Sequence, residues 1–146
     1  MNIAIAEAKK GVRLNHGGPF GACIVKDGEV ISKGHNHVVS RIDPTAHGEV
    51  DAIRKACKKL GTFDLSGCEI YTTGFPCPMC FAAILWANID KVYYGCNTTD
   101  TELIGFRDKA FEENIPVLKQ QICHELNREE CLKLYEEYSS KERTKY

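Results

Sequence analysis

Two short motifs, thirty residues apart, constrain this chain more than any other feature of its sequence. One is Pro76-Cys77-Pro78-Met79-Cys80, in which two cysteines stand at positions i and i+3. The other, upstream, is Pro44-Thr45-Ala46-His47-Gly48-Glu49. Pro78 suits the first position of a helix, and an apolar stripe at helical spacing follows the upstream motif. The sequence therefore predicts two helices, each of which begins at one of the motifs.

The residue types in these motifs are those of a catalytic zinc site. Zinc is bound by thiolate and imidazole groups, and a catalytic site uses three protein ligands and keeps one position open. Cys77, Cys80 and His47 supply three such ligands. Helix N-termini favour anions, so they lower the pKa of the cysteine thiols. Glu49 is left free to move protons.

Other interpretations of the two motifs remain open at this point. Cys77 and Cys80 alone could form a redox pair, but His47 and Glu49 would then have no role. A structural, non-enzymatic zinc module needs four ligands, so His35 or His37 would have to join the site. Residues at i and i+2 do not share a helix face. His47 and Glu49 can therefore converge only within the first helical turn.

Composition excludes several classes of protein. The chain has 146 residues, 43% of them hydrophobic and 27% charged, with a formal net charge of −1, which fits one soluble domain over residues 1–146. It contains no apolar run of membrane-spanning length and no signal peptide, so we expect a cytoplasmic protein. A net charge of −1 does not give the basic surface that is typical of nucleic-acid-binding proteins. The other six cysteines fall in apolar patterns and are predicted to be buried.

Alternation of predicted strands and helices indicates an α/β fold with a partly parallel, mixed sheet. An N-terminal helix is expected at about 2–15, and Asn127 with Glu130 resembles a capping box that opens the last helix. Asp27-Gly28 predicts a hairpin turn. Strands are expected at 20–26, 29–34, 68–73 and 91–96, with a weaker fifth at 116–123.

Taken together, His-x-Glu followed by Pro-Cys-x-x-Cys is the signature of zinc-dependent deaminases. The chain resembles the cytidine-deaminase-like superfamily and, within it, the small bacterial guanine deaminases. The zinc motif specifies only the superfamily, and flanking matches carry the resemblance to the branch. These matches are Gly18-Pro19-Phe20-Gly21-Ala22, Asp43-Pro44-Thr45-Ala46-His47, Ala52-Ile53-Arg54-Lys55-Ala56-Cys57, Pro76-Cys77-Pro78-Met79-Cys80, Trp86-Ala87 and Gly105-Phe106.

The resemblance implies a three-layer α/β/α sandwich with a central five-stranded sheet. It also implies a homodimer in which the C-terminal segment, about 127–146, is exchanged between subunits. The expected reaction converts guanine to xanthine and ammonia, with zinc as cofactor and Glu49 as proton shuttle. Cytosine or another aminated heterocycle or nucleoside is an alternative substrate. A tRNA adenosine deaminase is a further alternative, although it would need a basic surface.

Substrate-binding residues also follow from the resemblance. Phe20 would stack near the purine, Asn36 would hydrogen-bond it, and the backbone of Gly48 would contact the ring. Trp86 would form a wall of the pocket, and Tyr146 would enter the partner's site from the exchanged tail. On spacing alone the two aromatic residues are core residues, Asn36 an ordinary loop residue, and Tyr146 simply the last residue.

A second carboxylate is implied near the leaving amine, at Asp108, which on sequence alone is an ordinary surface acid. This chain departs from the branch pattern at three positions. Gly48 replaces the usual Ala, Phe75 replaces a common Glu, and Arg107 replaces an acidic residue beside Asp108. These changes concern the pocket, and Arg107 could form an ion pair with Asp108.

Overall fold

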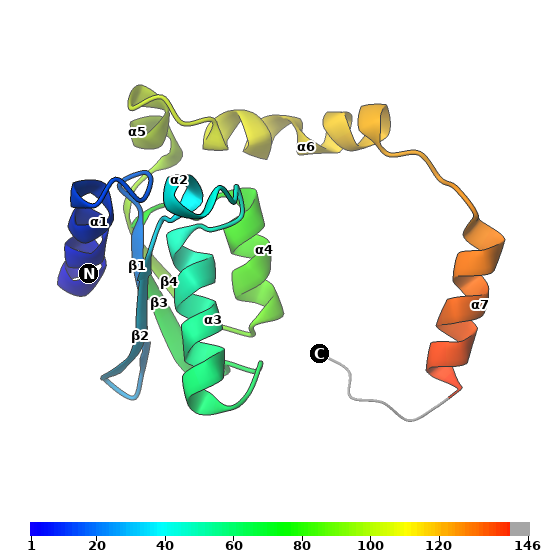
Figure 1. The fold of residues 1–146 in the computed structure, drawn as a ribbon, viewed down its shortest axis with the longest axis horizontal. Helices are drawn as coiled ribbons and strands as arrows, with labels where there is room; N and C mark the ends of the chain where they lie inside the picture. Colours follow the sequence, from blue (N-terminus) through cyan, green and yellow to red (C-terminus); the bar gives the residue numbers. More distant parts are fainter. Residues whose placement is uncertain (141–146) are drawn as a thin grey trace. The chain divides into compact units, whose positions relative to one another are not determined.

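Four strands form one mixed sheet in the order β2-β1-β3-β4 (Figure 1). The computed structural model describes residues 1–140, and it divides the chain into two compact units, 1–112 and 113 onward. β1 runs antiparallel to both β2 and β3, whereas β3 and β4 are parallel. The mixed sheet is therefore as the sequence predicts. The strands are β1 Gly21–Lys26, β2 Glu29–His35, β3 Cys68–Gly74 and β4 Lys91–Cys96.

Helices flank this sheet in the first unit. α1 packs against one face of the sheet, while α3 and α4 lie on the other face (Figure 1). The second unit contains α7 and most of α6. The helices are α1 Asn2–Arg13, α2 Val38–Arg41, α3 Gly48–Leu60, α4 Pro78–Trp86, α5 Thr98–Leu103, α6 Asp108–Ile122 and α7 Arg128–Ser139.

The hairpin between β1 and β2 turns at the predicted pair. Asp27 has φ 50° and Gly28 has φ 80°. Positive φ at both central residues is the mark of a type I′ turn, whose twist matches that of the paired strands. Lys26 consequently pairs with Glu29. Because β1 also pairs with β3 on its other side, it lies inside the sheet.

The main core lies between the sheet and helices α3 and α4. Ile24, Ile70 and Ile84 are essentially inaccessible to solvent. Burying one such side chain stabilises the fold by about 1.5–3 kcal/mol. The core fixes both helices against the same sheet face, so it also fixes the positions of their N-termini. Its remaining members are Ala22, Ala52, Ala56, Leu65, Cys68, Ala87 and Ile89.

The predicted fifth strand is wrong, because residues 116–123 fall almost entirely in α6. Ile115, Leu118 and Ile122 recur at i, i+3 and i+7, which is helical spacing. The intervening polar run, Lys119-Gln120-Gln121, consists of good helix formers and has no alternation of polar and apolar residues. Pro116 lies inside the helix and does not end it. The sheet therefore has four strands among the described residues.

Two smaller predictions also differ from the structure. Asn127 does precede α7, but its side chain forms no cap hydrogen bond, and Glu130 contacts Lys133 instead at 2.6 Å. A capping box is found at the start of α5, between Asn97 and Asp100.

The six cysteines outside the motif do not share one environment. Cys23 and Cys68 are buried, and Cys57 is half-buried. In contrast to the prediction, the remaining three, Cys96, Cys123 and Cys131, are exposed. Among residues 1–140, no helix is long and apolar enough to cross a membrane.

Candidate active site

The two motifs meet at the N-termini of α3 and α4. His47 is the N-cap residue of α3, Cys77 is the N-cap residue of α4, and Pro78 occupies the first helical position. His47 Nδ1 lies 3.5 Å from the Sγ atoms of both Cys77 and Cys80. Tetrahedral zinc with ordinary bond lengths sets such sulfur–nitrogen separations at roughly 3.6 Å. The three side chains therefore fit a zinc ion without rearrangement.

The negative charge on the cysteine thiolate of this ligand set also favours the binding of a cation. Cys77 is 8% exposed and Cys80 is fully buried. The neighbouring thiol of Cys80 and the imidazole of His47 lower the pKa of Cys77 to about 4, against the opposing effect of burial. Contact with Cys77, together with burial, raises the pKa of Cys80. The metal-free pair thus holds one proton, which a divalent cation would displace.

Glu49 lies in the first turn of α3, two residues after His47. Its side chain is 7% exposed, and burial raises the pKa of its carboxyl group above the ordinary value. The first turn brings Glu49 close to Cys80 and His47 despite their unfavourable spacing. A carboxyl group with a raised pKa can both accept and release a proton near neutral pH.

A fourth protein ligand is not part of this cluster. Among the described residues, the potential ligand atoms of His47, Cys77 and Cys80 form one group within 4.8 Å. His35 and His37, which a structural zinc site would have required, belong to a separate group with His16. The three-ligand arrangement is that of a catalytic site, which leaves a position open.

A cavity of about 450 Å³ opens beside these ligands. This volume suits a small heterocycle. Its walls combine aromatic rings with a few polar groups. The lining residues are Gly17, Gly18, Phe20, Asn36, Val38, Val39, Pro44, His47, Glu49, Phe75, Cys77, Phe106, Arg107, Asp108 and Phe111. A larger cavity of about 520 Å³ contains none of the metal ligands and is lined by residues such as Ile5, Val12 and Cys96.

Three of the predicted substrate residues lie in the cavity beside the metal ligands. Asn36 is 3% exposed, and its Oδ1 accepts a hydrogen bond from the backbone of Val38 at 3.1 Å. Its amide nitrogen is therefore available to donate to a ligand. The ring of Phe20 packs edge-on against Phe106 at 4.7 Å. Asp108 begins α6, and partial burial and the charge on Cys77 raise the pKa of its carboxyl group.

The other three predicted residues are not placed in the cavity. Gly48 starts α3, where a Cβ would lie 2.9 Å from the backbone oxygen of Phe20, but it does not line the cavity. Trp86 is 65% exposed at the end of α4 and is not among the lining residues either. Tyr146 lies outside the described residues. Their roles remain predictions.

The sequence associated Phe75 and Arg107 with the pocket, but it did not assign Phe106 or Phe111 to its walls. Phe75, Phe106 and Phe111 contribute aromatic rings to the walls. Phe75 also packs edge-on against Tyr94 at 5.0 Å. The Arg107 guanidinium lies over the Phe111 ring, 5.1 Å from its centroid, and makes no ion pair with Asp108 among the described residues. Phe75 directly precedes the cysteine motif, and Phe106 belongs to the Gly105-Phe106 match to the guanine deaminases. These positions are the sequence signal that could have marked both as lining residues.

Comparison with known proteins places the chain in a class of zinc enzymes. Residues 1–96 match the model for the cytidine and deoxycytidylate deaminase zinc-binding region. The chain belongs to this family of zinc-dependent deaminases.

The relatives of this chain include guanine deaminases and tRNA-specific adenosine deaminases. The chain is 50% identical to the guanine deaminase of Bacillus subtilis over 115 residues, 79% of this chain and 74% of that protein. The solved structure of the B. subtilis enzyme covers 99% of this chain and 94% of its own, with a TM-score of 0.91 at 40% identity. A tRNA-specific adenosine deaminase of Aquifex aeolicus is 47% identical over 94 residues, 64% of this chain and 62% of that protein. A guanine deaminase structure from Nitrosomonas europaea covers 72% of this chain and 61% of its own, with a TM-score of 0.68 at 32% identity.

Proposed function

We propose that this protein deaminates a free nucleobase, guanine, to xanthine and ammonia. The observation that carries the proposal is the structural similarity to B. subtilis guanine deaminase over 99% of the chain. The cavity supports it, because its aromatic rings and its few polar groups suit a flat purine.

The metal ligands, Glu49, Asn36 and Asp108 each have a distinct role in this reaction. His47, Cys77 and Cys80 would hold the zinc ion, which would make water acidic enough to lose a proton near neutral pH. Glu49 takes a proton from the attacking water and transfers it to a ring nitrogen of the substrate. Glu49 then takes the proton of the hydroxyl group added to the ring carbon and delivers it to the amine, which leaves as ammonia while the carbonyl forms. The amide nitrogen of Asn36 donates to an acceptor on the base, and the Asp108 carboxyl group faces the leaving amine.

A tRNA adenosine deaminase is the second candidate, because the Aquifex aeolicus relative is 47% identical. RNA binding relies on a basic surface that neutralises phosphates. This chain carries 19 basic and 20 acidic residues, for a net charge of −1. The charge balance therefore favours the free base over the nucleic acid.

Ammonia release from the zinc-loaded protein tests the substrate directly. The panel contains guanine, guanosine, cytosine, adenine and a tRNA anticodon stem-loop with adenosine at the wobble position. We expect release from guanine alone. Release from cytosine or from the stem-loop, but not from guanine, would retain the zinc chemistry and refute the proposed substrate.

We also propose that the active enzyme is a homodimer in which residues from about 127 to 146 are exchanged between subunits. In the first unit, α4 exposes several apolar side chains, among them Phe81, Leu85 and Trp86, which are 44%, 59% and 65% exposed. In the second unit, α7 exposes Leu134 and Tyr135. Exposed apolar surface on both units is typical of segments that are covered in an assembly. The exchanged tail would bring Tyr146 to the partner's site.

A further inference from the structure

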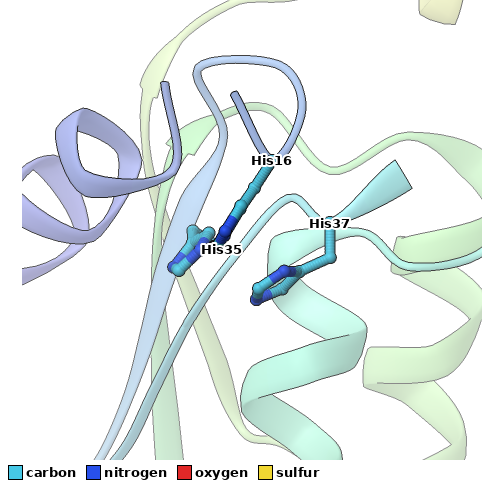
Figure 2. A group of neighbouring side chains, drawn as sticks. All are labelled: His16, His35 and His37. Atoms are coloured by element: carbon cyan, nitrogen blue, oxygen red, sulfur yellow. Dashed lines mark hydrogen bonds between the residues drawn. The ribbon is translucent and has the colours of Figure 1, made fainter. Parts of the chain in front are cut away.

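Three histidines form a second cluster outside the catalytic ligand set (Figure 2). His16 lies in the loop after α1, His35 is the last residue of β2, and His37 precedes α2. One potential ligand atom from each histidine lies within 4.8 Å of the other two. The proposed deamination uses none of these side chains.

The contacts of His35 define which of its nitrogens carries a lone pair. His35 Nδ1 lies 3.0 Å from Oε2 of Glu7, a buried carboxylate that can only accept a proton when ionised. Hydrogen bonding to His35 and Lys33 outweighs burial and lowers the pKa of Glu7. His35 therefore donates from Nδ1, and the lone pair is on Nε2. A carboxylate behind the imidazole is the arrangement that orients metal-binding histidines in proteins.

The lone pair of His35 points at His16. His16 Nδ1 lies 2.9 Å from His35 Nε2, so His16 donates a proton to His35 in the metal-free protein. Two imidazole ligands of a tetrahedral ion are separated by roughly 3.3 Å between their nitrogens. An ion can replace this shared proton if the two rings separate by a few tenths of an ångström.

His37 completes the cluster as a neutral imidazole. Its ring centroid lies 4.2 Å from that of His35 and 4.8 Å from that of His16. Burial and the nearby His35 and Arg41 lower the pKa of His37 to about 4. Its Nδ1 contacts Ser40 Oγ at 3.1 Å, and its Nε2 is 3.9 Å from Asp51. A rotation of this half-buried ring would direct a lone pair toward the other two histidines.

We propose that His16, His35 and His37 bind a second transition-metal ion, separate from the catalytic zinc. An all-imidazole site suits Zn²⁺, Co²⁺ or Ni²⁺ rather than Mg²⁺ or Ca²⁺, which prefer oxygen ligands. Asn36 stands between two of these histidines, and Gly17 follows the third; both line the substrate cavity. The ion would therefore fix the two segments that carry these cavity residues.

Metal content after equilibrium dialysis of the full chain against micromolar zinc tests the site. We expect about two zinc ions per wild-type chain and about one in His16→Gln and His37→Gln, since two ligands hold zinc much less well than three. His124→Gln removes the one histidine outside both clusters, and it should keep two ions. One ion in the wild type, or two in both cluster variants, would overturn the proposal.

Cobalt provides a second readout that does not depend on turnover. Co²⁺ is added to protein that already holds one zinc ion per chain, so the thiolates of Cys77 and Cys80 are occupied. The proposal predicts visible d–d absorption without a thiolate charge-transfer band in the wild type, and no such absorption in His16→Gln. Charge-transfer bands, or equal spectra for the two proteins, would contradict it.

Thermal unfolding distinguishes loss of the site from loss of the fold. Zinc beyond one ion per chain should raise the Tm of the wild type and of His124→Gln, because binding stabilises the folded state. His16→Gln and His37→Gln should unfold cooperatively, with a Tm that does not respond to the second ion. A cluster variant that still responds as the wild type does would refute the assignment.

Discussion

Asn36 is the residue whose contacts most directly define its role toward the substrate. Its Oδ1 accepts a hydrogen bond from the Val38 backbone, which orients the side chain and leaves its amide nitrogen to donate to the base. Asn36→Asp keeps the acceptor and removes the donor. We expect kcat/KM for guanine to fall about 10- to 100-fold, the loss of one buried hydrogen bond, with Tm little changed. Steady-state kinetics and calorimetry would measure both, and an unchanged kcat/KM would contradict the assigned contact.

Asp51 links the stability of α3 to pH. Burial alone would raise the pKa of Asp51, which is 4% exposed, but hydrogen bonds from Lys55 at 2.6 Å and Arg41 at 3.1 Å lower this pKa below its ordinary value. A depressed pKa stabilises the fold above the unfolded-state value, and this stabilisation is lost as pH falls through the folded-state value. Asp51→Asn should therefore lower the free energy of unfolding by about 1–3 kcal/mol at pH 7.

Urea titrations of both proteins at several pH values provide the measurement. The difference in the free energy of unfolding between wild type and Asp51→Asn should decrease as pH falls from about 5 to about 3. A difference that stays constant with pH would mean that the charge of Asp51 does not stabilise the fold.

The sequence motifs predicted the grouping of His47, Cys77 and Cys80 that the structure shows, whereas the walls of the cavity had weaker sequence signals. His47, Cys77, Cys80 and Glu49 lie in motifs whose spacing reflects zinc chemistry. Phe111 has no such signal, because its place in the cavity depends on where α6 begins. The sequence left open whether Arg107 would reorient Asp108 or form an ion pair with it, and the Arg107 guanidinium lies over Phe111.

The position of the N-terminus of α3 depends on the close packing of this helix against β2. A Cβ at Gly34 would lie 2.7 Å from the backbone of Gly48 and Ala52. Gly34→Ala should therefore displace the start of α3, which carries His47 and Glu49. We expect a loss of about 1–3 kcal/mol in the free energy of unfolding, together with weaker zinc retention.

Chemical denaturation and zinc analysis would test this expectation. Gly74→Ala is the matched control, because the nearest atom to its new Cβ, in the Phe20 ring, would lie at 3.5 Å, an ordinary contact. If Gly34→Ala and Gly74→Ala had equal stability and zinc content, the close packing of α3 on β2 would not be what positions the ligands.

Element prediction succeeded where local patterns were unambiguous. The β1–β2 hairpin has a strong turn signal in Asp27-Gly28, and α4 begins at the predicted Pro78. The region after β4 was harder to predict, since Pro116 and the apolar residues around it are compatible with a strand and a helix. The helical spacing of Leu118 and Ile122 agrees with the outcome.

At the level of the whole molecule, the proposed homodimer predicts that a charged substitution on the exposed face of α4 weakens dimerisation. Leu85 is 59% exposed, as expected of a residue covered by a second subunit. Leu85→Lys should shift the protein from dimer to monomer in sedimentation velocity and lower its activity. Leu14→Lys places the same change at a 47%-exposed leucine next to α1, and it should leave the dimer intact. A dimer that survives Leu85→Lys would exclude this face from the interface.

The proposed reaction is the conversion of guanine to xanthine at a zinc site with Glu49 as proton shuttle. It is tested most directly by xanthine formation from guanine in wild-type and Glu49→Gln proteins matched for zinc content. The wild type should turn over guanine, and Glu49→Gln should retain zinc but lose at least about 10²-fold in kcat. Equal turnover by the two proteins, or no xanthine from the zinc-loaded wild type, would contradict the account.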